Sequence, residues 1–351
     1  MLFSLVKIFV PTAVAFFSGM LITPLATHFF FKYQMWKKTA RTQNTSSLEF
    51  KSVHETKALQ EVSVPCVGGV IVLFSVIITT LVFAVLPYFF KSAIFDELNF
   101  LSREQTLVPL FIFIFGAFLG LVDDVLEIHG RSHITRNSPW YTKLKISMVV
   151  LCGLLAGWWF FSKLGMNTIH IPFDGYVYLG WLFIPAVVLV MFGTFSGGVI
   201  DGIDGLAGGV MTTIFAAYAV VAYIGNYLDI AALCGVVAGA VLAFLWFNIP
   251  PARFYMGEVG MMPLTITLAA VAFLTDTVLL LPIIAFPLVL TSLSSAIQII
   301  SKKFFGKKVF KVAPIHHHFE ALGWPSHKVT MRFWVLSVIF SIIGIILKVV
   351  S

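Results

Sequence analysis

The fold class of this chain follows from the stretch Leu107–Val122, L-V-P-L-F-I-F-I-F-G-A-F-L-G-L-V, which is followed directly by Asp123 and Asp124. The stretch contains no charged side chain. A helix needs about 20 predominantly apolar residues to cross the ~30 Å of hydrocarbon in a bilayer. An aspartate in the middle of a membrane helix costs roughly 2.5–3.5 kcal/mol, so the two acids mark the end of the span. We therefore predict a transmembrane helix that ends at the membrane surface.

Composition extends this prediction to the whole chain. Of the 351 residues, 59% are hydrophobic and 11% are charged, and the mean hydropathy is +0.97. A soluble domain contains about 25% charged residues, so most of this chain must lie in lipid. The formal net charge of +7 is typical of a membrane protein that keeps its lysines and arginines on the cytoplasmic face. The lipid bilayer is therefore an expected partner, and nucleic acid is not.

Hydropathy predicts about ten transmembrane helices in an all-α integral membrane protein, with residues 1–351 forming a single domain. Pro282 and Pro287 predict a break in the ninth segment, and the first segment is too long for a signal peptide. The predicted segments are Leu5–Phe31, Val67–Phe90, Thr106–Val122, Ile146–Phe161, Leu179–Phe195, Leu206–Ile224, Ile230–Phe247, Met261–Thr275, Val278–Ile300 and Phe333–Leu347.

The distribution of basic residues predicts the orientation of the bundle. The loops after the first, third, fifth, seventh and ninth segments hold 18 of the 23 lysines and arginines. The positive-inside rule places these loops in the cytoplasm and both termini on the extracytoplasmic side. Every unusual polar cluster falls in the same loops, from the pair Asp123–Asp124 to the three consecutive histidines 316–318. We therefore expect several loops to form one site on the cytoplasmic face.

The pair Asp123–Asp124 indicates a cation site. Adjacent carboxylates repel each other, so one of the two pKa values rises unless a metal or a lysine compensates. Magnesium fits this chemistry, because it binds one or two carboxylates and completes its shell with phosphate oxygens and water. Two solvated loop acids are the alternative interpretation.

A second motif, S-G-G-V-I-D-G-I-D-G-L-A-G-G, covers residues 196–209. Its Asp201 and Asp204 are three positions apart and would share one face of a helix. Glycines let backbone N–H groups approach a ligand closely, and the start of a helix favours phosphate. Close helix packing with an aspartate cap is the alternative, but it does not account for two aspartates at the membrane edge.

Two further segments carry candidate binding residues. The loop W-F-N-I-P-P-A-R-F-Y-M-G-E-V-G contains Asn248, Tyr255 and Glu258. These side chains can hydrogen-bond a base, stack on it and bind a metal, respectively, whereas an aromatic belt at the membrane surface is the alternative. Lys143, at the start of the fourth segment, can contribute positive charge to a phosphate site or simply extend toward the membrane surface.

The histidine segment Ala313–Trp324, A-P-I-H-H-H-F-E-A-L-G-W, contains His316, His317 and His318. Consecutive side chains point about 100° apart on a helix or to alternate faces of a strand, so three neighbours rarely converge on one zinc ion. A solvated basic loop is the alternative to a functional one. For a functional loop on this face, we expect an anionic substrate rather than a metal as the partner.

Taken together, these motifs resemble the polyprenyl-phosphate N-acetylhexosamine-1-phosphate transferase superfamily. The run G-K-K-V-F-K-V-A-P-I-H-H-H-F-E-A-L-G-W-P-S-H-K-V-T-M-R-F-W, residues 306–334, carries most of the resemblance. Its P-x-H-H-H-F-E form is typical of the muramoyl-pentapeptide branch. H-x-x-K at residues 54–57 and P-C-V-G-G at residues 65–69 extend the resemblance over essentially the whole chain.

The resemblance implies a magnesium-dependent reaction in a bacterial inner membrane. Phospho-N-acetylmuramoyl-pentapeptide would pass from UDP-N-acetylmuramoyl-pentapeptide to undecaprenyl phosphate, with release of UMP and formation of the first lipid intermediate of peptidoglycan. The implied catalytic residues are Asp123, Asp124, His316, His317 and His318. The implied magnesium ligands are Glu258, Asp123 and Asp124. The implied substrate-binding residues are Asp201, Asp204, Asn248, Tyr255, Lys143 and Lys57.

The chain departs from the family pattern at several positions. Glu258 replaces an aspartate, Gly198 replaces an asparagine, and Cys66 replaces a threonine. Glu61 and Glu127 stand where the family pattern has basic residues. Lys57 is expected to supply the positive charge that Glu61 removes.

Other functions remain open at this point. The first is that of a sister transferase that uses a UDP-N-acetylhexosamine without a peptide. The second is that of an ion-coupled transporter, because carboxylates within membrane segments often mark ion paths. A catalytically weak relative with a binding role is the third. Assembly into a homodimer is also left open.

Overall fold

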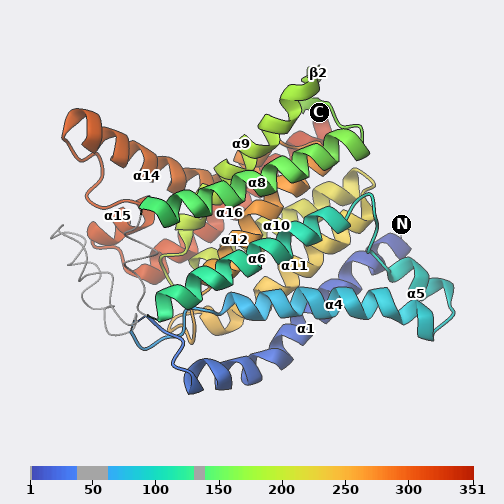
Figure 1. Cartoon of the computed structure of the whole chain (residues 1–351), viewed down its shortest axis with the longest axis horizontal. Helices are drawn as coiled ribbons and strands as arrows, with labels where there is room; N and C mark the ends of the chain where they lie inside the picture. The colour runs from blue at the N-terminus through green and yellow to red at the C-terminus, as the bar shows by residue number, and fades with distance from the viewer. Residues whose placement is uncertain (1, 38–61, 130–138) are drawn as a thin grey trace.

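The computed structural model of the chain describes residues 2–37, 62–129 and 139–351. Figure 1 shows long helices packed side by side into one bundle, with both chain ends at one end of it and α15 at the other. In chain order, the elements are α1 Leu2–Lys32, α4 Gly69–Phe89, α5 Ala93–Leu98, α6 Leu107–Ile128, α8 Pro139–Lys163, β1 Thr168–Ile171, β2 Gly175–Tyr178, η2 Gly180–Leu182, α9 Phe183–Ser196, η3 Gly197–Ile200, α10 Leu206–Ile224, α11 Leu228–Asn248, α12 Glu258–Leu274, α13 Leu281–Ile284, α14 Phe286–Phe305, α15 Ile315–Ala321 and α16 Ser326–Val350.

The helices confirm an integral membrane protein. Within the described ranges, 8 helical segments are long and apolar enough to cross a bilayer, namely α1, α4, α6, α8, the continuous segment Gly180–Ile200 formed by η2, α9 and η3, and α10, α11 and α16. Each of the ten predicted segments contains a helix. The ninth is divided at Ala285 into α13 and α14, which confirms the predicted break. The full number of spans and the side on which the termini lie stay predictions.

Helices α11 and α12 lie at the centre of the bundle. Every residue of α12 except Glu258 is buried, and α11 packs against α1, α4 and α10. A Cβ atom placed on Gly235 or Gly239 of α11 would collide with Thr12 of α1, so these glycines let the two backbones approach each other. Small residues are the usual means of close packing in lipid, where the solvent provides no hydrophobic driving force between helices.

Glycines also allow α6 to pack closely against α12. Gly116, Gly120 and Asp124 are spaced four residues apart, so they lie along one face of α6. A Cβ atom on Gly116 would lie 2.9 Å from the Cα atom of Pro263, and one on Gly120 would overlap the backbone of Glu258. The glycines therefore bring this face of α6 against the N-terminal half of α12, and Asp124 follows on the same face.

Several local features differ from the sequence predictions. Helix α6 continues past Val122 to Ile128, so Asp123 and Asp124 lie in its last two turns rather than in a loop. The histidines, predicted in a loop, lie on the short helix α15. A hairpin of β1 and β2, with Thr168 opposite Tyr178, connects α8 to α9 and was not predicted. The extension of α6 brings Asp124 against the first N–H groups of α12, a contact that hydropathy alone does not reveal.

Candidate active site

A cavity of about 650 Å³ gathers residues from four of the segments singled out in the sequence, together with α8. It is lined by the ends of α6 and α8, by the turn before α10, by the loop between α11 and α12, and by α15. The predicted site residues that line it are Asp123, Asp124, Asp201, Asp204, Asn248, Tyr255, Glu258 and His317. The structure therefore brings these residues together in one cavity, and their functional roles stay predictions.

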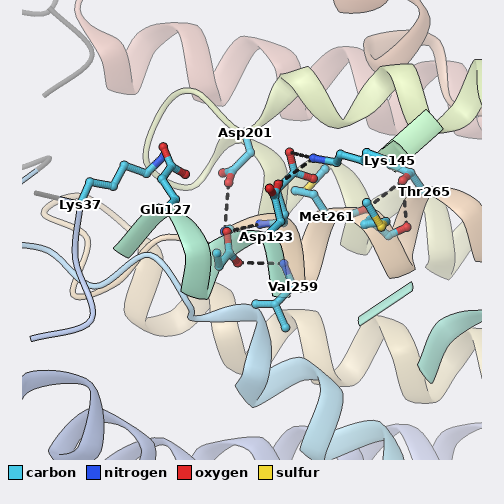
Figure 2. A network of polar contacts seen from close by, with 12 residues as sticks. Lys37, Asp123, Glu127, Lys145, Asp201, Val259, Met261 and Thr265 are labelled. Atoms are coloured by element: carbon cyan, nitrogen blue, oxygen red, sulfur yellow. Dashed lines mark hydrogen bonds and ion pairs between the residues drawn. The ribbon is translucent and has the colours of Figure 1, made fainter. Parts of the chain in front are cut away.

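The ammonium group of Lys145 joins two of the carboxylates. Its Nζ atom lies 2.8 Å from Oδ2 of Asp123 and 2.8 Å from Oε1 of Glu258. Figure 2 shows Lys145 reaching from α8 toward Asp123 on α6. The Asp123 side chain is only 16% exposed, whereas that of Glu258 is 40% exposed. The mostly buried ammonium group of Lys145 thus holds together two acids from different helices.

Asp124, the neighbour of Asp123, has a different environment. Its side chain is buried, and its two oxygens accept hydrogen bonds from the backbone N–H groups of Glu258 (3.1 Å) and Val259 (2.9 Å). These are the first residues of α12, whose N–H groups have no partner within the helix. A carboxylate is also stabilised by the positive end of the helix dipole. Asp124 therefore fixes the start of α12 and, with it, the position of Glu258.

Asp201 and Asp204 lie in a turn rather than on a helix. Oδ2 of Asp201 accepts a hydrogen bond from the N–H group of Gly257 at 3.3 Å, and Oδ2 of Asp204 accepts one from the N–H group of Ala252 at 3.3 Å. Both aspartates therefore hold the loop between α11 and α12 against the turn before α10. Both also line the cavity.

Asn248 connects the same two loops and is buried. Its Oδ1 accepts a hydrogen bond from the N–H group of Gly205 at 2.9 Å, and its Nδ2 donates one to the carbonyl of Phe254 at 2.9 Å. Gly205 begins α10 with a φ of +75°, a left-handed conformation in which a side chain would be strained. Asn248 thus positions the loop that carries Tyr255.

The three histidines have three different surroundings. His317 lines the cavity, and its Nδ1 lies 2.7 Å from Oε2 of Glu320. His316 is buried, with its ring centroid 4.3 Å from that of His317. A Cβ atom on Gly202 would lie 2.6 and 2.7 Å from their Nε2 atoms, so only glycine lets the turn at residues 201–205 meet both rings.

His318 points toward a different part of the molecule and is not among the residues that line the cavity. Its Nδ1 accepts a hydrogen bond from the N–H group of Lys311 at 3.2 Å, and its ring packs against Phe310. Partial burial, together with the charge of Lys311, lowers the pKa of His318, so the ring is neutral at physiological pH. As expected from consecutive positions, the three rings do not converge on one point.

Lys145 and Lys37 are cavity residues that sequence reasoning missed. Lys143 was predicted instead of Lys145, but Lys143 is exposed and does not line the cavity. Residues that are two positions apart on a helix point about 200° apart around its axis, so only one of Lys143 and Lys145 can face the cavity. The sequence K-L-K contains no information on which face of α8 is packed. Lys57, the other predicted lysine, lies outside the described residues.

The charges in the cavity fit a divalent cation. Its lining includes the carboxylates of residues 123, 124, 127, 201, 204 and 258, against the two ammonium groups of Lys37 and Lys145. This acidic balance attracts cations and repels phosphates. Within the described ranges, no three Asp, Glu, His or Cys side chains form a ready metal cluster. Magnesium needs only one or two carboxylates when phosphates supply the other ligands, and Asp123 and Glu258, which already share one cation, fit that requirement.

The chain is similar to known proteins over most of its length. The model of glycosyl transferase family 4 matches residues 106–276. A phospho-N-acetylmuramoyl-pentapeptide-transferase of Chloroflexus aurantiacus is 34% identical over 83% of this chain and 79% of the relative. The chain is also similar to two proteins of the same name. One, from Geobacillus thermodenitrificans, is 30% identical over 97% of this chain and 98% of the relative. The other, from Clostridium perfringens, is 33% identical over 82% of this chain and 83% of the relative. The chain therefore belongs to the phospho-N-acetylmuramoyl-pentapeptide transferase family, and it is a phospho-sugar transferase rather than a transporter.

Proposed function

We propose that this protein transfers phospho-N-acetylmuramoyl-pentapeptide from UDP-N-acetylmuramoyl-pentapeptide to undecaprenyl phosphate, with release of UMP. The observation that carries the proposal is the convergence of Asp123 and Glu258 on Lys145 in a cavity at one end of a membrane bundle. The cavity combines carboxylates for a cation with an ammonium group for phosphate. The names of the relatives at 30–34% identity support the choice of donor and acceptor.

The reaction is the transfer of a phosphoryl group between two phosphates. A phosphate oxygen of the lipid acceptor attacks the phosphorus of the donor that bears the sugar. The bond from this phosphorus to the bridging oxygen breaks, and UMP leaves with the electron pair of that bond. Such reactions depend mostly on the positions of the reactants and on neutralisation of their charge.

Within this scheme, Asp123 and Asp124 have different roles. Asp123 reaches the cavity, where its Oδ2 atom contacts the ammonium group of Lys145, so it is placed to accept a proton from the lipid phosphate. Asp124 is occupied by two backbone N–H groups and positions α12. Lys145 would donate hydrogen bonds to phosphate oxygens once the substrates enter. His317, oriented by Glu320, faces the same space.

Magnesium is part of the proposal. Asp123 and Glu258 would hold the ion together with phosphate oxygens of the substrates, in keeping with its preference for oxygen ligands. When bound, magnesium would neutralise the negative charge on the reacting phosphates. The acidic lining of the cavity supports this role, because two anionic substrates cannot enter it without additional positive charge.

We further propose that the protein lies in the bacterial inner membrane with this cavity on the cytoplasmic face. The support is the distribution of basic residues, since the loops that form the cavity belong to the set that holds 18 of the 23 lysines and arginines. Both chain ends lie at the end of the bundle away from α15, as the predicted orientation requires (Figure 1).

The proposal is tested with the purified full-length protein in lipid nanodiscs. With UDP-N-acetylmuramoyl-pentapeptide, undecaprenyl phosphate and magnesium, we expect release of UMP and formation of a lipid-linked product. Asp123→Asn should lower kcat by at least about 100-fold, whereas Asp96→Asn, at an exposed position of α5, should leave it unchanged. Absence of UMP release from wild-type protein, under conditions in which a known transferase is active, would refute the proposal.

A further inference from the structure

The ammonium group of Lys145 has a neighbour that takes no part in the scheme above. The ring of Phe195 lines the active-site cavity, and the Nζ atom of Lys145 lies over this ring, 5.8 Å from its centroid. A cation within about 6 Å of a ring centroid is attracted by the negative charge on the face of the ring. The Lys145 side chain is only 19% exposed, and such an attraction is stronger where water is excluded.

Close packing of α8 against α9 brings the two side chains together. Lys145, Gly153 and Gly157 belong to one row of residues spaced four apart on α8, the kind of row along which helices pack. A Cβ atom on Gly153 would lie 3.0 Å from the Cα atom of Val188, and one on Gly157 would lie 3.2 Å from an earlier Cα atom of α9. The two helices therefore run in opposite directions. The start of α8 consequently meets the end of α9, where Phe195 lies.

The ring attracts the ammonium group without using any of its hydrogen-bond donors. An ammonium group carries three N–H donors, and Lys145 contacts one oxygen of Asp123 and one of Glu258. Phenylalanine has no acceptor atom, so the third donor stays available for a phosphate oxygen. A carboxylate or an amide at position 195 would accept that donor, whereas a leucine would fill the space without attracting the cation.

This property becomes important when the reaction begins, a step that rests on the proposed function. In that scheme, Asp123 and Glu258 hold magnesium, and Asp123 also accepts a proton. Both carboxylates then turn away from Lys145, so the ion pairs that position its ammonium group in the resting protein are weakened. The face of the Phe195 ring is neither protonated nor bound by magnesium. Its attraction for the ammonium group therefore persists.

We infer that Phe195 is a positioning residue that holds the ammonium group of Lys145 at the reacting phosphates while Asp123 and Glu258 bind magnesium. Phe195 acts through Lys145 and not on the substrates themselves. The relevant property is the negative charge on the face of the ring, rather than the volume of the side chain.

The test replaces Phe195 of the purified full-length protein with phenylalanine that carries one, two or three fluorine atoms. Fluorine withdraws electrons from the face of the ring and changes its size only slightly. We expect log kcat to fall with each added fluorine, to a total loss of about 5-fold or more, and Phe195→Leu to cause a similar loss. The KM values for both substrates should stay unchanged, because the contact to phosphate is needed most in the transition state.

The chain offers a closely matched control. The guanidinium carbon of Arg253 lies over the ring of Phe247, also 5.8 Å from its centroid, and neither residue lines the cavity. Fluorination of Phe247 should leave kcat unchanged. If Phe195 merely fills space, its fluorination will leave kcat unchanged as well, and the inference is overturned. A loss that is the same for one, two and three fluorines would also overturn it.

Chemical labelling separates this inference from the proposed function, because it requires no turnover. Lys145 is acetylated with acetic anhydride in the absence of substrates, with magnesium or with EDTA, and the rate is followed by mass spectrometry. Fluorination of Phe195 should accelerate acetylation of Lys145, and more so with magnesium, when the carboxylates are engaged. Acetylation of the exposed Lys143, on the same helix, should stay unchanged.

The labelling result has clear alternatives. A rate at Lys145 that does not depend on fluorination, or an acceleration that is the same with magnesium and with EDTA, would overturn the inference. If the wild-type protein shows no turnover but the acceleration depends on magnesium as expected, the proposed reaction fails and the positioning of Lys145 by Phe195 stands.

Discussion

Replacement of Asp124 by asparagine tests how the active site is assembled. The carboxylate is buried and accepts two hydrogen bonds, at 3.1 and 2.9 Å, from the first N–H groups of α12. Hydrogen bonds to a charged group contribute roughly 1.5–3 kcal/mol each. Asparagine keeps one acceptor oxygen but directs an NH2 group at the second N–H group, which leaves buried donors without an acceptor.

The expected loss of unfolding free energy follows from these contacts. Loss of one charge-assisted hydrogen bond and an unsatisfied buried donor together cost about 3–6 kcal/mol. Removal of a buried charge offsets part of this loss, because its desolvation no longer opposes folding. We therefore expect a net destabilisation of about 2–4 kcal/mol for Asp124→Asn.

The assay compares thermal unfolding of Asp124→Asn and Asp123→Asn in the same detergent, followed by tryptophan fluorescence. Asp124→Asn should lower Tm by about 3–5 °C, whereas Asp123→Asn should leave Tm nearly unchanged, because its partner Lys145 retains Glu258 at 2.8 Å. Both variants should lose activity. Equal Tm values for Asp124→Asn and wild-type protein would refute the role of Asp124 in fixing α12.

Three further predictions concern other positions. Gly120→Val should lower both Tm and activity, because its side chain would overlap the backbone of Glu258 and separate α6 from α12; unchanged unfolding would show that the helices can move apart without loss. Asp276→Asn should raise Tm at pH 7, because burial raises the pKa of the Asp276 carboxyl. The native state of the wild-type protein therefore loses stability as the pH rises from the unfolded pKa of 3.8 through the native pKa. The gain in Tm should shrink as the pH is lowered toward 4, and a gain in Tm that does not depend on pH would contradict this cause. Burial, reinforced by the charge of Asp124, raises the pKa of the Cys66 thiol to about 12. Cys66 should therefore resist alkylation by N-ethylmaleimide at pH 8 until the protein is unfolded. Rapid labelling of the folded protein, detected by mass spectrometry, would show that the site opens.

Much of the fold was predictable because a membrane imposes a simple rule on sequence. In lipid, each backbone polar group must find its partner within the chain, so long apolar runs become helices. All ten predicted segments contain a helix, and the break before α14 follows from Pro282 and Pro287. The ends of helices were less predictable. Helix α6 continues to Ile128 because Asp124 finds its partners on α12, a contact that hydropathy does not register.

The residues of the candidate site were likewise predictable only in part. Asp123, Glu258 and His317 were identified from the residues and from the family pattern that the chain resembles, and all three line the cavity. The distinction between Asp123 and its neighbour Asp124 was not available, because adjacent residues of equal charge differ only in what surrounds them. Lys145 was missed in favour of Lys143 for the same reason.

The sequence by itself determined that this protein is a helical membrane protein, which segments carry its chemistry and which family it resembles. These properties depend on hydropathy, spacing and residue type, all of which are local in the chain. Only the tertiary structure decided which carboxylate faces the cavity, which lysine joins Asp123 to Glu258, and that Lys37 meets Glu127. Those contacts depend on the rotation and depth of each helix, which Gly116 and Gly120 set by allowing α6 to pack closely against α12.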